Sequence, residues 1–269
     1  MSIQAELYHV FKSWKSRFFI LLVFLIPMID LLFVIHQNIV PQWPVEWSYR
    51  RIALYHPCMA SFLSAAAHGH IMQMLLIWLM PIYILLIYGD SYIQEKTVGY
   101  TAIIYSHYSR KKVLYTRFAV SFLLFFGAFF LSMLLNFILA NIIFINGGSM
   151  KGLEQLAYDD VLPAWLAWSL RNPYLSYLLC MAAYSLIAGA GGVLCYAVCL
   201  LFPSYKLAYP ICFFLWFLQI ASRYSITYAI QPYIEYGPEK FLIALLRYFA
   251  IALIIILICR WREVKCDKI

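Results

Sequence analysis

The residues best suited to chemistry or binding gather in one polar stretch, residues 90–104, between two apolar segments. It contains the acidic–basic pair Glu95 and Lys96, and Ser91 and Gln94 have the spacing of a helix capping box. The pattern predicts a short helix with one polar and one apolar side. Such a helix can dock into a groove of a soluble partner, or it can rest on a membrane surface as an amphipathic loop helix. The spacing alone leaves both interpretations open.

A second group of residues has the donor atoms of a metal site. Imidazole nitrogens and thiolates bind copper and zinc. Four histidines and one cysteine lie in or beside the first predicted outer loop: His36, His56, Cys58, His68 and His70. His68 and His70 are spaced i, i+2, so their rings would point to different sides of a helix. No usual spacing of metal ligands occurs in this group. We therefore expect interfacial histidines rather than a metal site, and no cofactor in this chain.

Motifs of known catalysts are missing from the sequence. It contains neither the G-x-S-x-G nucleophile turn nor the H-E-x-x-H zinc motif. The run Ser109-Arg110-Lys111-Lys112 matches S-x-x-K, but it lies in a basic segment and lacks the companion motifs. The phosphate-binding loop G-x-x-x-x-G-K-[ST] is absent as well, so the chain has no such device for ATP. These absences predict that the chain is not an enzyme.

The composition of the chain is unusual, and it indicates which kind of structural elements carry these residues. Of 269 residues, 65% are hydrophobic and 12% are charged, against about 45–50% and about 25% in soluble domains. A soluble fold of this size could not bury so much apolar surface, so the sequence predicts an integral membrane protein. The formal charge of +8 does not indicate nucleic acid, because the basic residues flank apolar segments in short runs. No linker divides the chain, and residues 1–269 are predicted to form one transmembrane domain.

Continuous apolar segments predict an all-α fold with six transmembrane helices. A spanning helix requires about 20 mostly apolar residues, whereas barrel strands would alternate with a period of two. Ahead of the first segment, residues 1–17 place Leu7, Val10, Phe11 and Trp14 on one stripe, which predicts an interfacial amphipathic helix. The predicted spans are 18–35, 71–88, 118–145, 174–202, 207–221 and 241–259, with a loop at 90–117 between the second and the third.

Lysine and arginine are distributed unevenly between the two sides of this arrangement. With the N-terminus inside, the larger share falls in residues 1–17, in the 90–117 loop and in the C-terminal tail. Cytoplasmic segments of membrane proteins carry such an excess. We therefore expect a multi-pass protein of the cytoplasmic membrane with both termini in the cytoplasm.

Two ionisable residues lie inside predicted spans, Asp30 in the first and Arg247 in the sixth. Intramembrane charges mark functional or packing-critical positions. The two residues are expected at similar depth, which allows an ion pair within or between subunits. Alternatively, Arg247 extends to the outer interface and Asp30 faces a wet cavity.

Small residues in the fourth predicted span favour close helix packing. Glycine and alanine let helix backbones approach one another in membranes. The residues concerned are Ala188, Gly189, Gly191 and Gly192.

The order of these features resembles the permeases of ABC-2-type transporters. Glu95-Lys96 matches the acidic–basic pair of that family's cytoplasmic loop, although arginine is commoner at the second place. Gly99 matches the glycine that follows, but Tyr100-Thr101 stands where threonine or serine usually comes directly. Ser109-Arg110 follows an apolar stretch, and Arg117 lies near the place of the basic residue that opens the third span. The resemblance covers the whole chain and depends on the order of these elements.

The resemblance implies that residues 90–117 contain a coupling helix, which receives force from a nucleotide-binding subunit. It implies two separate ATPase chains, which would bind ATP and Mg²⁺, and a second permease copy or a sister permease. Aromatic residues make 19% of the chain, so the expected exported substrate is hydrophobic or amphipathic, such as a peptide, an antibiotic or a lipid-like compound. The expected coupling residues are Glu95, Lys96, Gly99, Tyr100 and Arg110.

Two other functions compete with this interpretation. A stand-alone secondary transporter or channel would show inverted repeats and several buried charges. A membrane-embedded hydrolase would need catalytic motifs that the sequence lacks. Co-purification with an ATPase would distinguish the permease from both.

Overall fold

A computed structural model of the chain describes residues 3–42, 54–64, 71–151, 153 and 163–266. Within this part of the chain the structure is helical, with one isolated bridge between Tyr55 and Ser149 and no β-strand. Several of its helices are long and apolar enough to cross a membrane, so the protein is an all-helical membrane protein. The four single helices of this length are α2 (Trp14–Asn38), α9 (Arg110–Ile143), α12 (Pro173–Leu201) and α15 (Pro238–Cys266).

The segment predicted as one span at 71–88 is broken in two. Helix α5 (Ile71–Trp78) ends before Leu79, and helix α6 (Met80–Ile84) continues at an angle of 62°. Proline in the first turn of α6 has no backbone N–H and favours a helix start there, which explains the break. A π-helical turn, η2 (Leu85–Gly89), completes the segment. The bent pair is a fifth candidate span.

The segment predicted as a span at 207–221 is a short helix, α13 (Tyr205–Ile220). Its 16 residues would reach about 24 Å, whereas the hydrocarbon core of a bilayer is about 30 Å thick. Pro210 lies inside this helix. The described residues therefore contain four to five helices of spanning length, and six spans stay a prediction.

Two predicted boundaries change because helices end or begin earlier than the apolar pattern indicates. Helix α1 (Ile3–Lys12) stops at Ser13, whose extended backbone caps α2, so the predicted 1–17 helix is two helices. Its expected stripe is divided: Val10 is buried, whereas Phe11 and Trp14 are exposed. Helix α9 begins at Arg110 and carries the third span inward, which leaves only 90–109 of the predicted 90–117 loop.

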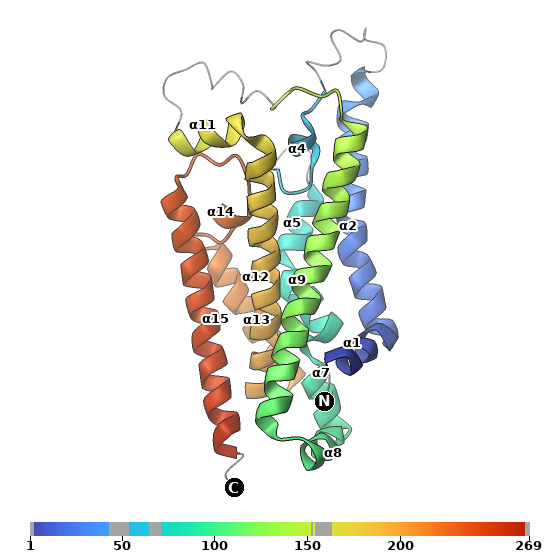
Figure 1. The fold of residues 1–269 in the computed structure, drawn as a ribbon, viewed down its shortest axis with the longest axis vertical. Coiled ribbons are helices and arrows are strands. Elements are labelled where there is room, and N and C mark those ends of the chain that lie inside the picture. Colours follow the sequence, from blue (N-terminus) through green and yellow to red (C-terminus); the bar gives the residue numbers. More distant parts are fainter. Residues whose placement is uncertain (1–2, 43–53, 65–70, 152, 154–162, 267–269) are drawn as a thin grey trace.

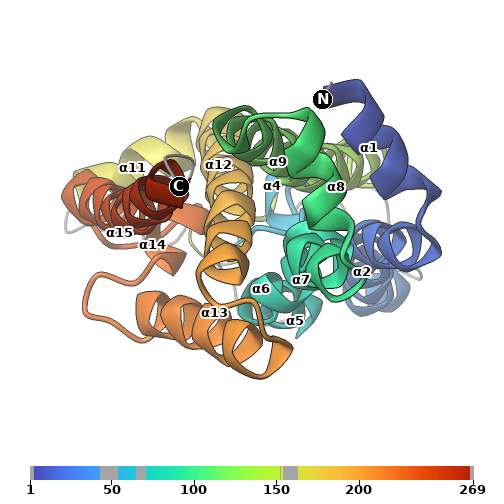
Figure 2. The same ribbon diagram turned by 90° about the horizontal axis from the view of Figure 1, so that it is seen from below.

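Helix α12 is the centre of the bundle and packs against α6, α9, α13 and α15 (Figures 1 and 2). In the most apolar 18-residue stretch of α12, 78% is buried, compared with 22% in the corresponding stretch of α15. Its glycines lie at these contacts: an added Cβ at Gly192 would collide with the ring of Phe125 on α9, and one at Gly191 would lie 2.9 Å from the hydroxyl of Tyr248 on α15. Gly189 faces α9 in the same way, and Ala188 is fully buried.

The short helices gather toward the two ends of the bundle. Helices α1, α7 (Ser91–Thr97) and α8 (Tyr100–His107) lie at the end that also holds both chain termini (Figure 1). We call this the basic end, because the lysines and arginines of 110–112 and 260–265 also lie there. The helices α4 (Pro57–Ala60), α11 (Ala164–Arg171) and α14 (Thr227–Ile230), and the turn η1 (Val40–Gln42), lie toward the other end.

Candidate functional site

A buried arginine organises the basic end. Arg117, on α9, has a side chain that is 2% exposed, and its Nη2 lies 2.7 Å from Oε2 of Glu95 on α7. The same nitrogen is 3.7 Å from Oε1 of Glu6 on α1. A buried cation is costly unless it is paired, so this contact holds α1 and α7 against α9.

Two tyrosines complete the surroundings of this arginine. Arg117 donates from Nη1 to the hydroxyl of Tyr196 on α12 at 3.0 Å, and Tyr88 donates to Glu6 at 3.3 Å. The rings of Tyr88 and Tyr196 stack with centroids 5.8 Å apart. One guanidinium therefore links four elements through charges and hydroxyls: α1, α7, α9 and α12.

Glu95 is turned inward rather than toward solvent. Its side chain is 19% exposed, and burial raises the pKa of its carboxyl above the usual value, although the charge of Arg117 acts in the opposite direction. The two side chains are at ion-pair distance without the alignment of a hydrogen bond. The carboxylate is thus paired within the chain, and its expected contact with another subunit stays a prediction.

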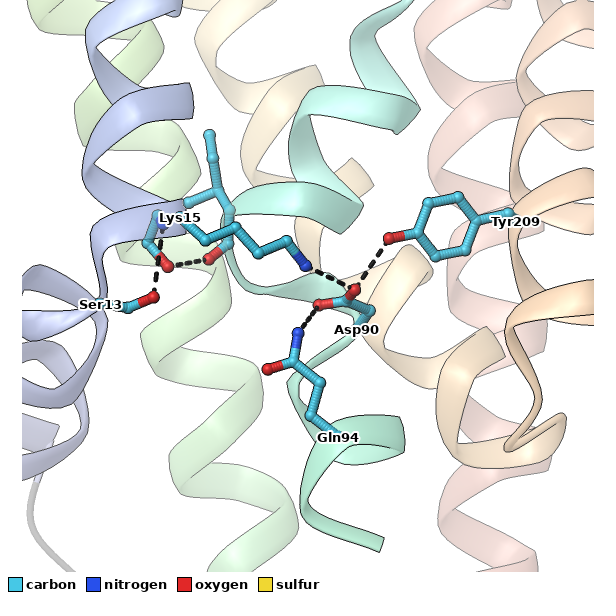
Figure 3. Close-up of polar contacts among 7 residues, drawn as sticks. Ser13, Lys15, Asp90, Gln94 and Tyr209 are labelled. Carbon is cyan, nitrogen blue, oxygen red and sulfur yellow. Dashed lines mark hydrogen bonds and ion pairs between the residues drawn. The ribbon is translucent and has the colours of Figure 1, made fainter. Parts of the chain in front are cut away.

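A second carboxylate joins α7 to two further elements at the same end, α2 and α13. Asp90, the residue before α7, is 3% exposed and lies 2.8 Å from Nζ of Lys15 on α2. The hydroxyl of Tyr209 on α13 donates to it at 2.8 Å, and Nε2 of Gln94 donates at 2.9 Å. Figure 3 shows these three side chains converging on the carboxylate from different helices. The predicted capping box does not form, because Asp90 stands at the N-cap and Gln94 bonds to its side chain.

Gly99 separates the two helices of the predicted coupling segment. Its φ is +78°, in the left-handed region, and an added Cβ would meet nothing within 4 Å. Left-handed geometry costs other residues about 1–2 kcal/mol. Glycine is therefore required here by the turn from α7 to α8, and not by close approach of a neighbour.

The outer side of this turn is exposed and partly apolar. Lys96 is exposed, and Val98, Tyr100 and Ile103 are 84%, 49% and 57% exposed. Arg110 begins α9 and lies over the ring of Tyr105, with 5.0 Å to the centroid. Of the five predicted coupling residues, Lys96, Gly99 and Tyr100 thus share an exposed surface, whereas Glu95 is 19% exposed and pairs with Arg117.

A groove of about 520 Å³ opens beside this surface, between α1 and the turn. Glu6, His9 and Glu95 lie along its polar side, and Tyr100 and Tyr108 supply aromatic surface. The groove can therefore receive a side chain that carries a positive charge or an aromatic ring.

The two intramembrane ionisable residues have separate surroundings within the chain. Arg247 donates to the side-chain oxygen of Gln219 at 2.7 Å and to the hydroxyl of Ser222, which fastens α15 to the end of α13. Asp30 is 1% exposed on α2. Burial lowers the pKa of Lys151 to about 8, and the negative charge of Asp30 acts in the opposite direction. Each of the two residues thus has its own neighbours.

The predicted group of histidines and a cysteine is dispersed where the structure describes it. His56 caps α4 by accepting from the backbone N–H of Cys58 at 3.2 Å, and burial raises the pKa of the Cys58 thiol to about 12. His36 is exposed at the end of α2, while His68 and His70 lie outside the described residues. Across the described ranges, no three histidine, cysteine, aspartate or glutamate side chains come together as a metal site would need.

Sequence reasoning missed most of the buried polar contacts. Glu6, Asp90 and Tyr209 carried no expectation, and Arg117 was noted only for its place at the start of a span. One signal was available: Asp90 and Arg117 flank apolar segments directly, where a charge is held at the edge of the membrane. The residues that contact Asp90 and Arg117 could not be predicted from the spacing of residues along the sequence.

The fold and these contacts define a multi-pass helical membrane protein whose basic end is held together by buried ion pairs. The chain is 32% identical over 254 residues to a protein of Bacillus subtilis (strain 168), uncharacterized protein YybM, and the match covers 94% of this chain and 95% of that protein. The chain therefore belongs to the family of YybM. No protein-family model and no solved structure matches it.

Proposed function

We propose that this chain is the membrane-spanning permease subunit of an ATP-driven ABC-2-type exporter. The observation that carries the proposal is the pair α7–α8, which is exposed at its tip and anchored at its base. Val98 and Ile103 offer apolar surface to a soluble partner, while Glu95 and Asp90 connect the same segment to the membrane helices. Force applied at the tip would be transmitted through ion pairs to α2 and α9, and through hydrogen bonds of Tyr196 and Tyr209 to α12 and α13.

The proposed topology has six spans with the basic end in the cytoplasm. The bent α5–α6 segment would form the second span and α13 the fifth, with α13 reaching the interfaces through flanking residues. The excess of lysine and arginine at the basic end supports this orientation. An ATPase would then meet α7, α8 and the groove beside α1.

The cargo path is proposed to lie between two permease units. The cavity at the α6 break, among α6, α12, α13 and α15, has about 20 Å³, which is space for roughly one water. A hydrophobic or amphipathic molecule needs a wider route, which a second copy or a sister permease would supply. ATP and Mg²⁺ would be bound by the partner ATPase chains.

The broken α5–α6 segment favours one competing function, a stand-alone secondary transporter. Discontinuous helices form the binding sites of many such proteins. That function predicts cargo movement by the chain alone, without nucleotide. Transport in liposomes that contain the purified chain and no ATPase would support it and exclude the permease.

The permease proposal is tested by co-purification with candidate ABC ATPase chains co-expressed with this protein. Val98→Asp and Ile103→Asp should weaken ATPase binding at least tenfold, since each places a charge in an apolar contact. Lys112→Gln, an exposed change on α9, is the matched control and should bind normally. Membrane abundance must be equal for all variants. Normal ATPase binding by both aspartate variants would exclude the α7–α8 tip as the docking surface.

A further inference from the structure

An open groove of about 810 Å³ lies between the first turns of α9 and the last turns of α15. It is at the basic end, where the lower ends of both helices lie in Figure 1. Its lining combines three cations, two aromatic rings and two aliphatic side chains, and contains no acidic residue. The lining residues are Lys111, Tyr115, Leu257, Ile258, Arg260, Trp261 and Lys265.

Five of these side chains form two stripes that are ordered along the helix axes, and Arg260 lies beside the rings. Along α15, Leu257, Trp261 and Lys265 follow one another at i, i+4 and i+8, so they form one stripe with steps of about 6 Å. Along α9, Lys111 and Tyr115 form a similar stripe in the opposite direction. Both stripes run from cation to aromatic ring toward the middle of the bundle, and the α15 stripe continues to an aliphatic side chain.

The lining of the groove contains no carboxylate, and two of its three cations lie over its aromatic rings. Nζ of Lys265 lies over the ring of Trp261, 3.8 Å from the centroid, and the guanidinium of Arg260 lies 5.9 Å from the ring of Tyr115. The neighbouring carboxylate, Glu263, is buried and lies on the side of α15 that faces α7 and α8. Its charge interacts with the hydroxyls of Tyr92 and Tyr105. Positive charge therefore prevails in the groove.

We infer that this groove binds an anionic phospholipid of the leaflet at the basic end. The phosphate would lie among Lys111, Arg260 and Lys265, the glycerol region beside Tyr115 and Trp261, and an acyl chain along Leu257 and Ile258. Basic pockets between membrane helices recognise anionic head groups in this way, and aromatic rings suit the interface. The occupant is a lipid and not a soluble anion, because the apolar layer continues the groove into the hydrocarbon region. The inference does not depend on transport or on an ATPase.

The test is native mass spectrometry of the full-length protein in mild detergent. The titrants are phosphatidylglycerol, phosphatidylcholine with the same acyl chains, and glycerol 3-phosphate. Phosphatidylglycerol should bind at least tenfold more tightly than phosphatidylcholine, and glycerol 3-phosphate should not compete at millimolar concentration. Equal binding of the two lipids would overturn the inference. Competition by glycerol 3-phosphate would instead identify a soluble-anion site.

Variants separate a built site from diffuse charge. A surface cation is worth about fivefold in affinity for an anionic lipid, so Lys111→Gln with Lys265→Gln should weaken phosphatidylglycerol binding about twenty-fivefold. Lys112→Gln, one residue away and outside the groove, should change it less than twofold. The charge-conserving pair Lys111→Arg and Lys265→Arg should retain binding, which would show that loss in the glutamine variant is not misfolding. An equal loss in Lys112→Gln would overturn the inference.

Discussion

Arg117 and Glu95 lie 2.7 Å apart at the base of the α7–α8 segment, and the arginine is 2% exposed. This contact joins a helix outside the apolar bundle to a helix that runs through it. The carboxylate of Glu6 adds a second, longer contact to the same guanidinium at 3.7 Å. The loop position that sequence reasoning assigned to an outside partner is thus part of the chain's own structure.

Removing the arginine should destabilise the protein. Arg117→Leu leaves two largely buried carboxylates without their cation, and the loss of one partner of a buried pair costs about 3–5 kcal/mol. We expect the free energy of unfolding to fall by roughly that amount in a denaturant titration followed by circular dichroism. Lys112→Leu, an exposed cation on the same helix, should change it by less than about 0.5 kcal/mol. Equal effects of the two changes would show that the Arg117 contacts are not stabilising.

Glu95 should make stability depend on pH. Its pKa is raised in the folded protein, mainly by burial, so the folded state holds a proton that the unfolded state has released. The stabilising contribution is fully present below the unfolded pKa and is lost as pH rises through the folded pKa. The melting temperature of the parent protein, relative to Glu95→Gln, should therefore fall as the pH rises above the ordinary value of 4.5 for this carboxyl. Glu239→Gln, at an exposed position, should show no such trend. A difference that rises with pH would contradict the assignment.

Tyr209 should stabilise the basic end through Asp90. A hydrogen bond to a charged group contributes about 1.5–3 kcal/mol, so Tyr209→Phe should lower the free energy of unfolding by about 2 kcal/mol. Tyr205→Phe, one turn earlier on α13 and 42% exposed, is the matched control. Its effect should be below about 0.5 kcal/mol. Denaturant titration measures both, and equal losses would exclude a specific contribution from the Asp90 contact.

Two glycines should respond in opposite directions to alanine. Gly99→Ala forces an alanine into left-handed geometry and should cost about 1 kcal/mol, although no atom lies within 4 Å of the added Cβ. Gly127 lies inside α9 with equally open surroundings. Gly127→Ala should therefore stabilise the protein by about 0.5–1 kcal/mol. The sign of the two changes, measured by the same titration, is the test, and a gain at Gly99 would contradict the turn.

Impermeant cysteine labelling tests the proposed orientation. Ser109 and Asn146 are both exposed and lie near opposite ends of α9. In intact cells, and in a Cys266→Ser background, Ser109→Cys should stay unlabelled while Asn146→Cys reacts. The six cysteines described as buried should not contribute. The reverse pattern would place the α7–α8 segment outside the cell, where no ATPase could reach it.

The helices could be predicted because continuous apolar segments need little besides their own composition. The break at Leu79 could be anticipated from Pro81 alone, whereas the 62° angle between the two helices has no counterpart in the sequence. The contact between Asp90 and Tyr209 joins residues 119 positions apart and exists only once α7 and α13 are neighbours. Spacing along the sequence carries no information of this kind. The exposed residues of the turn were found more readily, because Gly99 marks the turn in the sequence itself.

The enclosure of α12 limits how the protein can assemble. Residues 187–200 of α12 are buried without interruption, and α6, α9, α13 and α15 of the same chain pack around the helix. The glycines that face α9 and α15 leave no space for another backbone. By contrast, the apolar windows of α2 and α15 are only 33% and 22% buried. An interface between two copies in the bilayer would therefore form along outer helices such as α2 and α15. Cysteine pairs placed in the buried stretch 187–200 of α12 should therefore not cross-link two copies in any oligomer, whatever its stoichiometry.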